Sequence, residues 1–190
     1  EALVAGREIV LLRLGHETDR YGRVSAVVFM TSVIAPDIGR SVQSELLAQG
    51  QARVAARIGD RACATALHAV EKTARAAGLG LWADPHYLVK KAGNHADILA
   101  QRGQFAVIEG KVQSVRESGG VIYVNFGGRW SEDFTVTVLK RNERSFAAAG
   151  LVLKKLAGRH VRVRGTIEER GGPWIEAMRP EQIEIAEPDR

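Results

Sequence analysis

Residues 105–128 read FAVIEGKVQSVRESGGVIYVNFGG, and this stretch decides the fold of the chain. Two apolar runs flank the turn sequence Ser118-Gly119-Gly120, which is typical of a β-hairpin. Further apolar runs follow, with a helical pattern between the third and the fourth. The expected strands are 105–115, 121–126, 134–139, 161–167 and 174–177, and the expected helix is 142–156. Three strands, a helix and two strands are the order of an OB-fold, a small barrel that commonly binds oligonucleotides.

The residues before this stretch carry a different pattern. Short apolar runs on either side of a polar turn predict a β-hairpin, and two helices are expected after it. Ser41 is suited to cap the first helix and Asp60 the second. The second helix has an apolar stripe that includes Cys63 and Leu67. The expected ranges are 8–14 and 24–30 for the strands, 41–50 and 60–77 for the helices, and 83–101 for a connecting segment.

Composition sets the outer limits on function. The chain has 190 residues, 45% hydrophobic and 26% charged, which are ordinary values for a globular protein. No apolar run approaches the ~20 residues that span a bilayer, which argues against an integral membrane protein. A single cysteine, Cys63, excludes an internal disulfide and a four-cysteine zinc site. The 27 basic and 22 acidic residues give a net charge of +5, which mildly favours an anionic partner.

Four pieces of the first 85 residues stand out by their order and spacing. They are Asp19-Arg20-Tyr21-Gly22-Arg23, Leu46-Leu47-Ala48-Gln49-Gly50, Ala52-Arg53-Val54 and Gly80-Leu81-Trp82-Ala83-Asp84-Pro85. Together they resemble the thermonuclease family, which is also called staphylococcal-nuclease-like. The resemblance implies a nuclease that hydrolyses the phosphodiester bonds of DNA or RNA with the help of a calcium ion.

The resemblance also assigns roles to the first of these pieces. It places Arg23 on a catalytic arginine that contacts the scissile phosphate, and Arg20 and Tyr21 in the substrate-binding turn. A guanidinium suits the role of Arg23 because it offers two parallel hydrogen bonds and stays charged at any working pH. The alternative is that Arg23 is a solvated turn arginine beside Asp19.

Other parts of the family pattern are not found in this sequence. The calcium-binding aspartates, the first arginine and the glutamate of the family lie in motifs that it does not contain, and Ala56 and Ile58 stand where the family has stacking tyrosines. We therefore expect the calcium ion to belong to an intact parent and these 190 residues to be weak or inactive as an enzyme. The stretch Glu1 to Gly6, which resembles a helix end at a glycine, suggests that more chain precedes it.

The second half resembles OB-fold modules of the anticodon-binding type. The segments that carry the resemblance are Val107-Ile108-Glu109-Gly110-Lys111-Val112, Tyr123-Val124-Asn125-Phe126-Gly127 and Val161-Arg162-Val163-Arg164-Gly165. It implies that Tyr123, Phe126 and Trp130 could stack on bases, while Arg162 and Arg164 could meet phosphates. Aromatic faces combined with cations are what single-strand binding requires.

Each of these residues also has a purely structural interpretation. Tyr123 and Phe126 differ by three positions, so they point to opposite faces of a regular strand, and we expect Phe126 to lie in the core. Trp130 could be exposed in its loop or packed against the end of the barrel. Arg162 and Arg164 could simply form the solvent face of an amphipathic strand.

We therefore predict a mainly β protein with α elements: a partial thermonuclease-like OB barrel with two helices, followed by a five-stranded OB-fold barrel. The expected divisions are 1–85, a linker over 86–103, and 104–186. The predicted function is nucleic-acid phosphodiester hydrolysis, aided by OB-fold binding of DNA or RNA, more readily single-stranded. The alternative is a non-catalytic module that binds nucleic acid or protein with a degenerate nuclease fold. The family resemblance further suggests a bacterial protein that is secreted or associated with the envelope.

Overall fold

The computed structural model describes residues 3–18, 20–30, 38–56, 58, 61–129 and 131–186. The chain forms two compact units, each with its own internal contacts. The first comprises Glu1–Val54 and Ile58–Leu88, and the second comprises Ala55–Arg57 and Val89–Arg190. Helices and several sheets are both present, so the expected mixed α+β class is confirmed.

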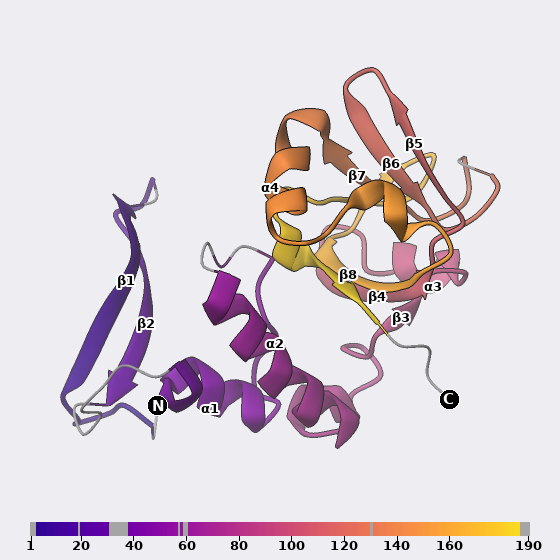
Figure 1. Cartoon of the computed structure of the whole chain (residues 1–190). Helices are drawn as coiled ribbons and strands as arrows, with labels where there is room; N and C mark the ends of the chain where they lie inside the picture. Colours follow the sequence, from indigo (N-terminus) through magenta and orange to yellow (C-terminus); the bar gives the residue numbers. More distant parts are fainter. Residues whose placement is uncertain are drawn as a thin grey trace. The chain divides into compact units, whose positions relative to one another are not determined.

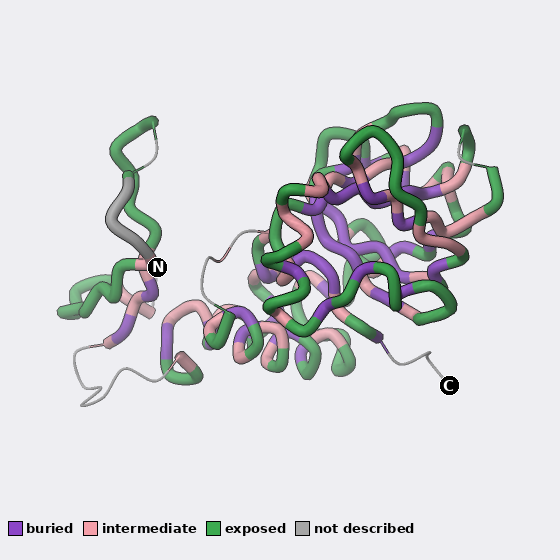
Figure 2. The backbone as a smooth tube through the Cα atoms, turned by 45° about the horizontal axis from the view of Figure 1, so that its top comes forward, coloured by how far each residue is buried: buried purple, intermediate pink, exposed green. Residues whose placement is uncertain are grey.

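The first unit begins with the expected hairpin. Strands β1 (Ile9–Thr18) and β2 (Val24–Met30) pair antiparallel, and β1 extends further into the predicted turn than its apolar run suggested. Val27 and Phe29 of β2 are buried, whereas the side chains at positions 9–12 of β1 are all exposed, with Leu11 at 57%. Figure 2 shows this contrast, because the first strand is coloured as exposed over most of its described length.

The helices of the first unit agree with the sequence pattern. They are η1 (Ile38–Arg40), α1 (Val42–Ala48), α2 (Arg61–Ala76) and η2 (Gly80–Ala83). Ser41 caps α1 as expected, since its hydroxyl accepts a hydrogen bond from the Ser44 amide at 3.1 Å. Asp60, the expected cap of α2, lies outside the described residues. Gly50, at φ +67°, ends the α1 region where a Cβ atom would lie 2.0 Å from the carbonyl oxygen of Leu79, so only glycine fits.

A buried carboxylate joins three segments of the first unit. Glu71 of α2 is fully buried, and its Oε2 accepts a hydrogen bond from the Val54 amide at 2.5 Å. Its Oε1 lies 3.0 Å from Nη1 of Arg75, whose guanidinium in turn lies over the ring of Trp82 at 5.5 Å from the centroid. The side chain of Glu71 therefore ties the extended segment before α2 to the helix, and Arg75 extends the connection to η2.

The second unit contains two sheets that share one long bent strand. Their order is β5-β6-β7-β10-β9 in one and β11-β8-β4-β3 in the other. The bounds are β3 (Lys90–Lys91), β4 (Phe105–Lys111), β5 (Ser114–Ser118), β6 (Val121–Asn125), β7 (Thr135–Leu139), β8 (His160–Thr166), β9 (Glu168–Arg170), β10 (Gly172–Glu176) and β11 (Ile183–Ile185). The predicted strand over 105–115 is broken at 112–113, so that β4 pairs with β8 and β5 pairs with β6.

The strands of the second unit pair in the order that is typical of an OB-fold. The bent strand β4–β5 contacts β8 at one end and β6 at the other, β6 pairs with β7, and β7 pairs in parallel with β10. The helical segment between β7 and β8 comprises η3 (Lys140–Asn142), α4 (Glu143–Ala148) and η4 (Leu153–Leu156). Figure 1 shows β5, β6 and β7 side by side, with α4 near one end of this sheet.

The expected linker over 86–103 differs from the structure. It contains β3, which pairs in parallel with β4, and α3 (His95–Leu99), which places the fully buried Ile98 in the core of the second unit. The second unit accordingly begins at Val89. These elements are too short to produce a visible period in the sequence, and Asn94, which caps α3, looks like a loop residue until its hydrogen bond to the Asp97 amide is seen.

Candidate nucleic-acid interface

One face of the sheet β5-β6-β7-β10-β9 points into the core and the other points outward. On β6, Ile122 and Val124 are buried, and the alternate residues Tyr123 and Asn125 are half-buried on the outer face. The register aligns Asn125 with Thr135 and Thr135 with Trp174, so these side chains share the outer face across three strands.

An aromatic pair and a cavity lie on this outer face. The rings of Tyr123 and Trp174 meet edge to face, with centroids 6.1 Å apart and an interplanar angle of 84°. The guanidinium of Arg170 lies over the Trp174 ring at 5.0 Å from its centroid. Beside them is a hollow of about 680 Å³, which we call the aromatic cavity. Its lining residues are Gln113, Ser114, Arg116, Ser118, Tyr123, Asn125, Gly127, Gly128, Thr135 and Trp174.

Polar groups line the floor of the aromatic cavity. The amide nitrogen of Asn125 donates to the Ser114 hydroxyl at 3.3 Å, and its carbonyl oxygen accepts from the Thr135 hydroxyl at 3.4 Å. The indole Nε1–H of Trp174 is buried and has no hydrogen-bond partner among the described residues.

The loop over 126–134 is held beside the cavity by one carboxylate. A Cβ atom on Gly127 would lie 2.1 Å from Cγ of Asp133, so the carboxylate needs a glycine at this position. Asp133 accepts a hydrogen bond from the Arg129 amide at 2.5 Å, and its other oxygen lies 3.3 Å from Nε2 of His95. Trp130, which was expected to offer a stacking face, belongs to this loop but lies outside the described residues.

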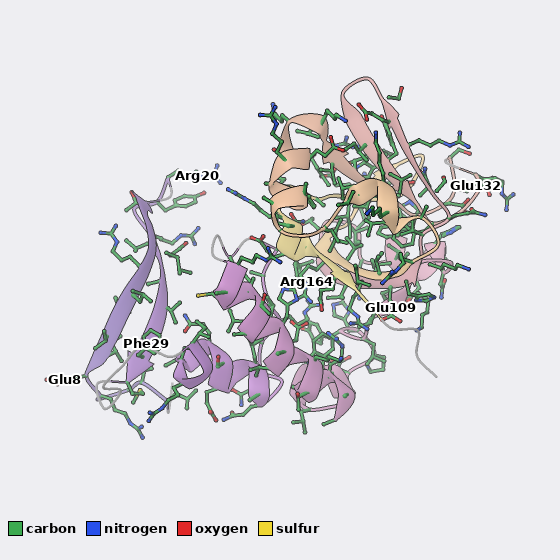
Figure 3. The ribbon with its side chains drawn as sticks, in the orientation of Figure 1. Glu8, Arg20, Phe29, Glu109, Glu132 and Arg164 are labelled. Carbon is green, nitrogen blue, oxygen red and sulfur yellow. The ribbon has the colours of Figure 1, made fainter. Side chains whose placement is uncertain are left out.

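Arg162 and Arg164 lie elsewhere, on β8 in the other sheet, and are paired with carboxylates. The guanidinium of Arg162 forms a salt bridge with the buried Glu109, and that of Arg164, whose side chain is 0% exposed, forms one with Glu184. Figure 3 labels Glu109 and Arg164 in this region. A phosphate could reach these arginines only by displacing their carboxylates. The structure therefore supports neither of the two interpretations of these arginines, which were contact with phosphates and the solvent face of an amphipathic strand.

Phe126 packs against the core of the second unit, as its spacing from Tyr123 predicted. Its ring lies 4.9 Å from that of the buried Phe134. Of the predicted pair Tyr123 and Phe126, it is Tyr123 whose ring borders the aromatic cavity.

The predicted turn residues of the first unit gather at the tip of the hairpin. Tyr21 is 65% exposed, with the guanidinium groups of Arg20 and Arg23 at 4.7 and 5.1 Å from its ring centroid. Figure 3 labels Arg20 at this tip. The arrangement concentrates positive charge around an aromatic ring, which is chemistry suited to an anionic, aromatic ligand.

The described residues do not fit a calcium ion. A calcium site needs several oxygen ligands, yet no group of three or more His, Cys, Asp or Glu side chains in the described ranges is arranged to hold a metal. Among the same residues, no helix has both the length and the apolar character needed to span a membrane.

Three residues of the aromatic cavity and its rim were not predicted from the sequence. Trp174 stands 51 positions after Tyr123 in the numbering and joins it only because β10 pairs with β7. Arg116 is opposite Tyr123 on β5, and Arg170 reaches Trp174 from β9. The pairing of β10 with β7 was not visible in the sequence.

Comparison with known proteins gives a likeness to solved structures that contain OB-like folds. An aspartyl-tRNA synthetase from Entamoeba histolytica is 11% identical, with a TM-score of 0.35 over 54% of this chain and 22% of that one. An asparaginyl-tRNA synthetase from Pyrococcus horikoshii is 19% identical, with a TM-score of 0.34 over 47% of this chain and 21% of that one. The chain thus spans about a fifth of these synthetases.

An OBody, AM1L10, bound to hen egg-white lysozyme is 21% identical, with a TM-score of 0.33 over 46% of this chain and 83% of that one. No curated protein matches the chain. The family described as Staphylococcal nuclease homologue matches residues 1–84, so this part of the chain is similar to that family.

Proposed function

We propose that the second unit binds single-stranded DNA or RNA on the outer face of β5-β6-β7-β10. The observation that carries the proposal is the aromatic cavity, where Tyr123 and Trp174 stand among hydrogen-bonding side chains with Arg116 and Arg170 at the margin. Stacking platforms beside cations are the usual means by which proteins hold single strands without reading their sequence.

We propose a different task for each aromatic ring. The two rings are nearly perpendicular, so one base cannot lie flat on both. Arg170 already lies over Trp174, which favours Tyr123 as the ring on which a base stacks. Arg116, which is exposed beside Tyr123, would meet a phosphate.

The test is binding of a labelled oligothymidylate or oligouridylate, followed by fluorescence anisotropy at several salt concentrations. Tyr123→Ala should weaken binding about tenfold or more, since stacking on an aromatic ring contributes about 1–3 kcal/mol per base. Tyr123→Phe is the matched control and should bind nearly as well as the wild type, because it keeps the ring. Equal binding by all three proteins would contradict the proposal.

Hydrolysis of the bound strand is a second candidate function, favoured by the match of residues 1–84 to the staphylococcal nuclease homologues. In this proposal Arg23 contacts the scissile phosphate, Arg20 and Tyr21 contribute to substrate binding, and calcium acts in the intact parent. The 190 residues given should then show weak or no hydrolysis with calcium. A clear calcium-dependent rate that Arg23→Ala leaves unchanged would overturn both the assigned residue and the expected inactivity.

The remaining candidate is a non-catalytic platform for nucleic acid or protein. It is favoured by the lack of a carboxylate cluster among the described residues. If the full-length parent protein binds an oligonucleotide without hydrolysing it, the result supports a platform for nucleic acid. No binding of either oligonucleotide at low salt would instead point to a protein partner.

A further inference from the structure

A second hollow, of about 350 Å³, lies further along the same outer face, and we call it the arginine cavity. Arg141 and Ser145 line it from the start of the helical segment, and Glu176 and Arg179 line it from the end of β10 and beyond. Leu139, which also lines it, follows Thr135 of the aromatic cavity by four positions on β7. At ~3.3 Å per residue the two cavities are about 13 Å apart along that strand.

The arginine cavity carries two guanidinium groups that differ from most others in this unit. Arg141 and Arg179 are exposed, and within the described part of the chain neither has a carboxylate partner. Arg162, Arg164 and Arg129, by contrast, each form a salt bridge with a glutamate. The carboxylate of Glu176 opposes the two cations, which leaves the lining with one net positive charge.

We infer that the arginine cavity binds a phosphodiester group of the same strand whose base stacks in the aromatic cavity. This inference rests on the proposed function. A strand that lies along the outer face of β7 passes from one cavity to the other within a few nucleotides. Arg141 and Arg179 come from different segments and can contact one phosphate from two sides, and guanidinium groups bind phosphate oxygens with paired hydrogen bonds.

The test compares two probes of different length. An oligothymidylate of about 12 nucleotides covers both cavities, and a thymidine dinucleotide fits the aromatic cavity alone. Arg141→Ala with Arg179→Ala should weaken binding of the long probe about tenfold, the sum of two exposed ion pairs. It should also reduce the slope of log affinity against log salt by about 0.7, because one phosphate contact of a single strand is lost. Binding of the dinucleotide, followed by nuclear magnetic resonance titration, should stay unchanged.

Two further variants separate charge from folding. Arg144→Ala is the matched control, because Arg144 is exposed on α4 and does not line the cavity, so it should bind the long probe within about twofold of the wild type. Glu176→Gln removes the opposing charge and should raise the affinity for the long probe about twofold. A disturbed fold would not raise affinity.

The outcomes distinguish this inference from the proposed function. If the double variant binds the long probe with unchanged affinity and salt slope while Tyr123→Ala loses binding, the arginine cavity is not a phosphate site and the proposed function stands. If the wild type binds neither probe at low salt, the proposed function fails and this inference fails with it.

Discussion

The two units differ in the size and composition of their buried clusters. The second unit has one continuous hydrophobic cluster that takes side chains from both sheets and from the helices α3 and α4. In the described part of the first unit, the cluster has Leu47, Val54 and Leu67 as its buried members, and the buried charge of Glu71 connects the segments around it. The second unit therefore has the larger apolar cluster, whereas the first combines a smaller one with buried polar contacts.

The largest effect is expected in the core of the second unit. Phe134 is completely buried and packs against Phe126, so Phe134→Ala should reduce the free energy of unfolding of this unit by about 3–5 kcal/mol. Denaturant unfolding measures the change. Val152→Ala, at an exposed apolar position of the same unit, should cost far less. Similar losses for both variants would show that the unit is not stabilised by this cluster.

The next effect tests the polar contacts of the first unit. Glu71→Ala leaves the buried Val54 amide without its acceptor and removes the partner of Arg75, which should cost about 2–3 kcal/mol. Glu71→Gln should cost less, because its amide oxygen can still accept from Val54. Hydrogen exchange of the Val54 amide reports the change directly, and Lys72→Ala, an exposed neighbour, serves as control. Protection of this amide that survives Glu71→Ala would refute the assigned contact.

A smaller effect is expected on the hairpin. Leu11 of β1 is exposed, so Leu11→Thr should change the free energy of unfolding by no more than about 0.5 kcal/mol. Val27 of β2 is buried, and Val27→Thr should cost about 1–3 kcal/mol because it buries a hydroxyl. Thermal unfolding of the two variants measures the difference. A large loss from Leu11→Thr would mean that this face is covered in solution.

The smallest effect concerns an exposed ion pair of the second unit. The Nζ of Lys140 donates a hydrogen bond to Glu117 at 2.7 Å, which lowers the pKa of Glu117 and raises the pKa of Lys140. The contribution of Glu117 to stability is complete above its unfolded pKa and is lost as the pH falls through its lowered folded pKa. That of Lys140 is complete below its unfolded pKa and is lost as the pH rises through its raised folded pKa.

Titration of Glu117, followed by carbon-detected nuclear magnetic resonance, measures its pKa and so checks this ion pair. In Lys140→Met the pKa of Glu117 should rise toward its ordinary value, while the overall stability changes little because both groups are exposed to solvent. An unchanged pKa of Glu117 in this variant would show that the hydrogen bond is not populated.

Local patterns in the sequence predicted much of the fold. The apolar runs around Ser118-Gly119-Gly120 predicted the hairpin turn and β6, because the period of a strand and a two-glycine turn are both encoded by near neighbours, whereas β5 overlaps the predicted strand 105–115 only at its end. The cap at Ser41 and the helix α2 were predictable for the same reason. Elements of two to five residues, such as β3 and α3, were missed because they are too short to show a period.

The candidate site depends on contacts between residues that are far apart in the sequence, and local sequence patterns do not predict such contacts. Tyr123 could be predicted as a candidate because it stands in a strand of recognisable type, but Trp174 reaches it only through the pairing of β10 with β7. Arg162 and Arg164 looked like a basic strand face, and the carboxylates that pair with them come from β4 and β11. Glu71 occupies an apolar helix stripe as a buried charge, and its partner amide at Val54 lies before the helix.

The bent strand β4–β5 has a consequence for the order of folding. Its β5 end pairs with β6 across a tight turn, whereas its β4 end pairs with β8, so that Glu109 meets a residue 53 positions away in Arg162. Closing such a long loop costs more entropy than closing a hairpin, so the meander β5-β6-β7 can form early and the barrel closes late. Trp174 joins the outer face only with β10, which pairs with β7. During synthesis, then, the outer face that carries Tyr123 and Trp174 becomes complete only after β10 has emerged.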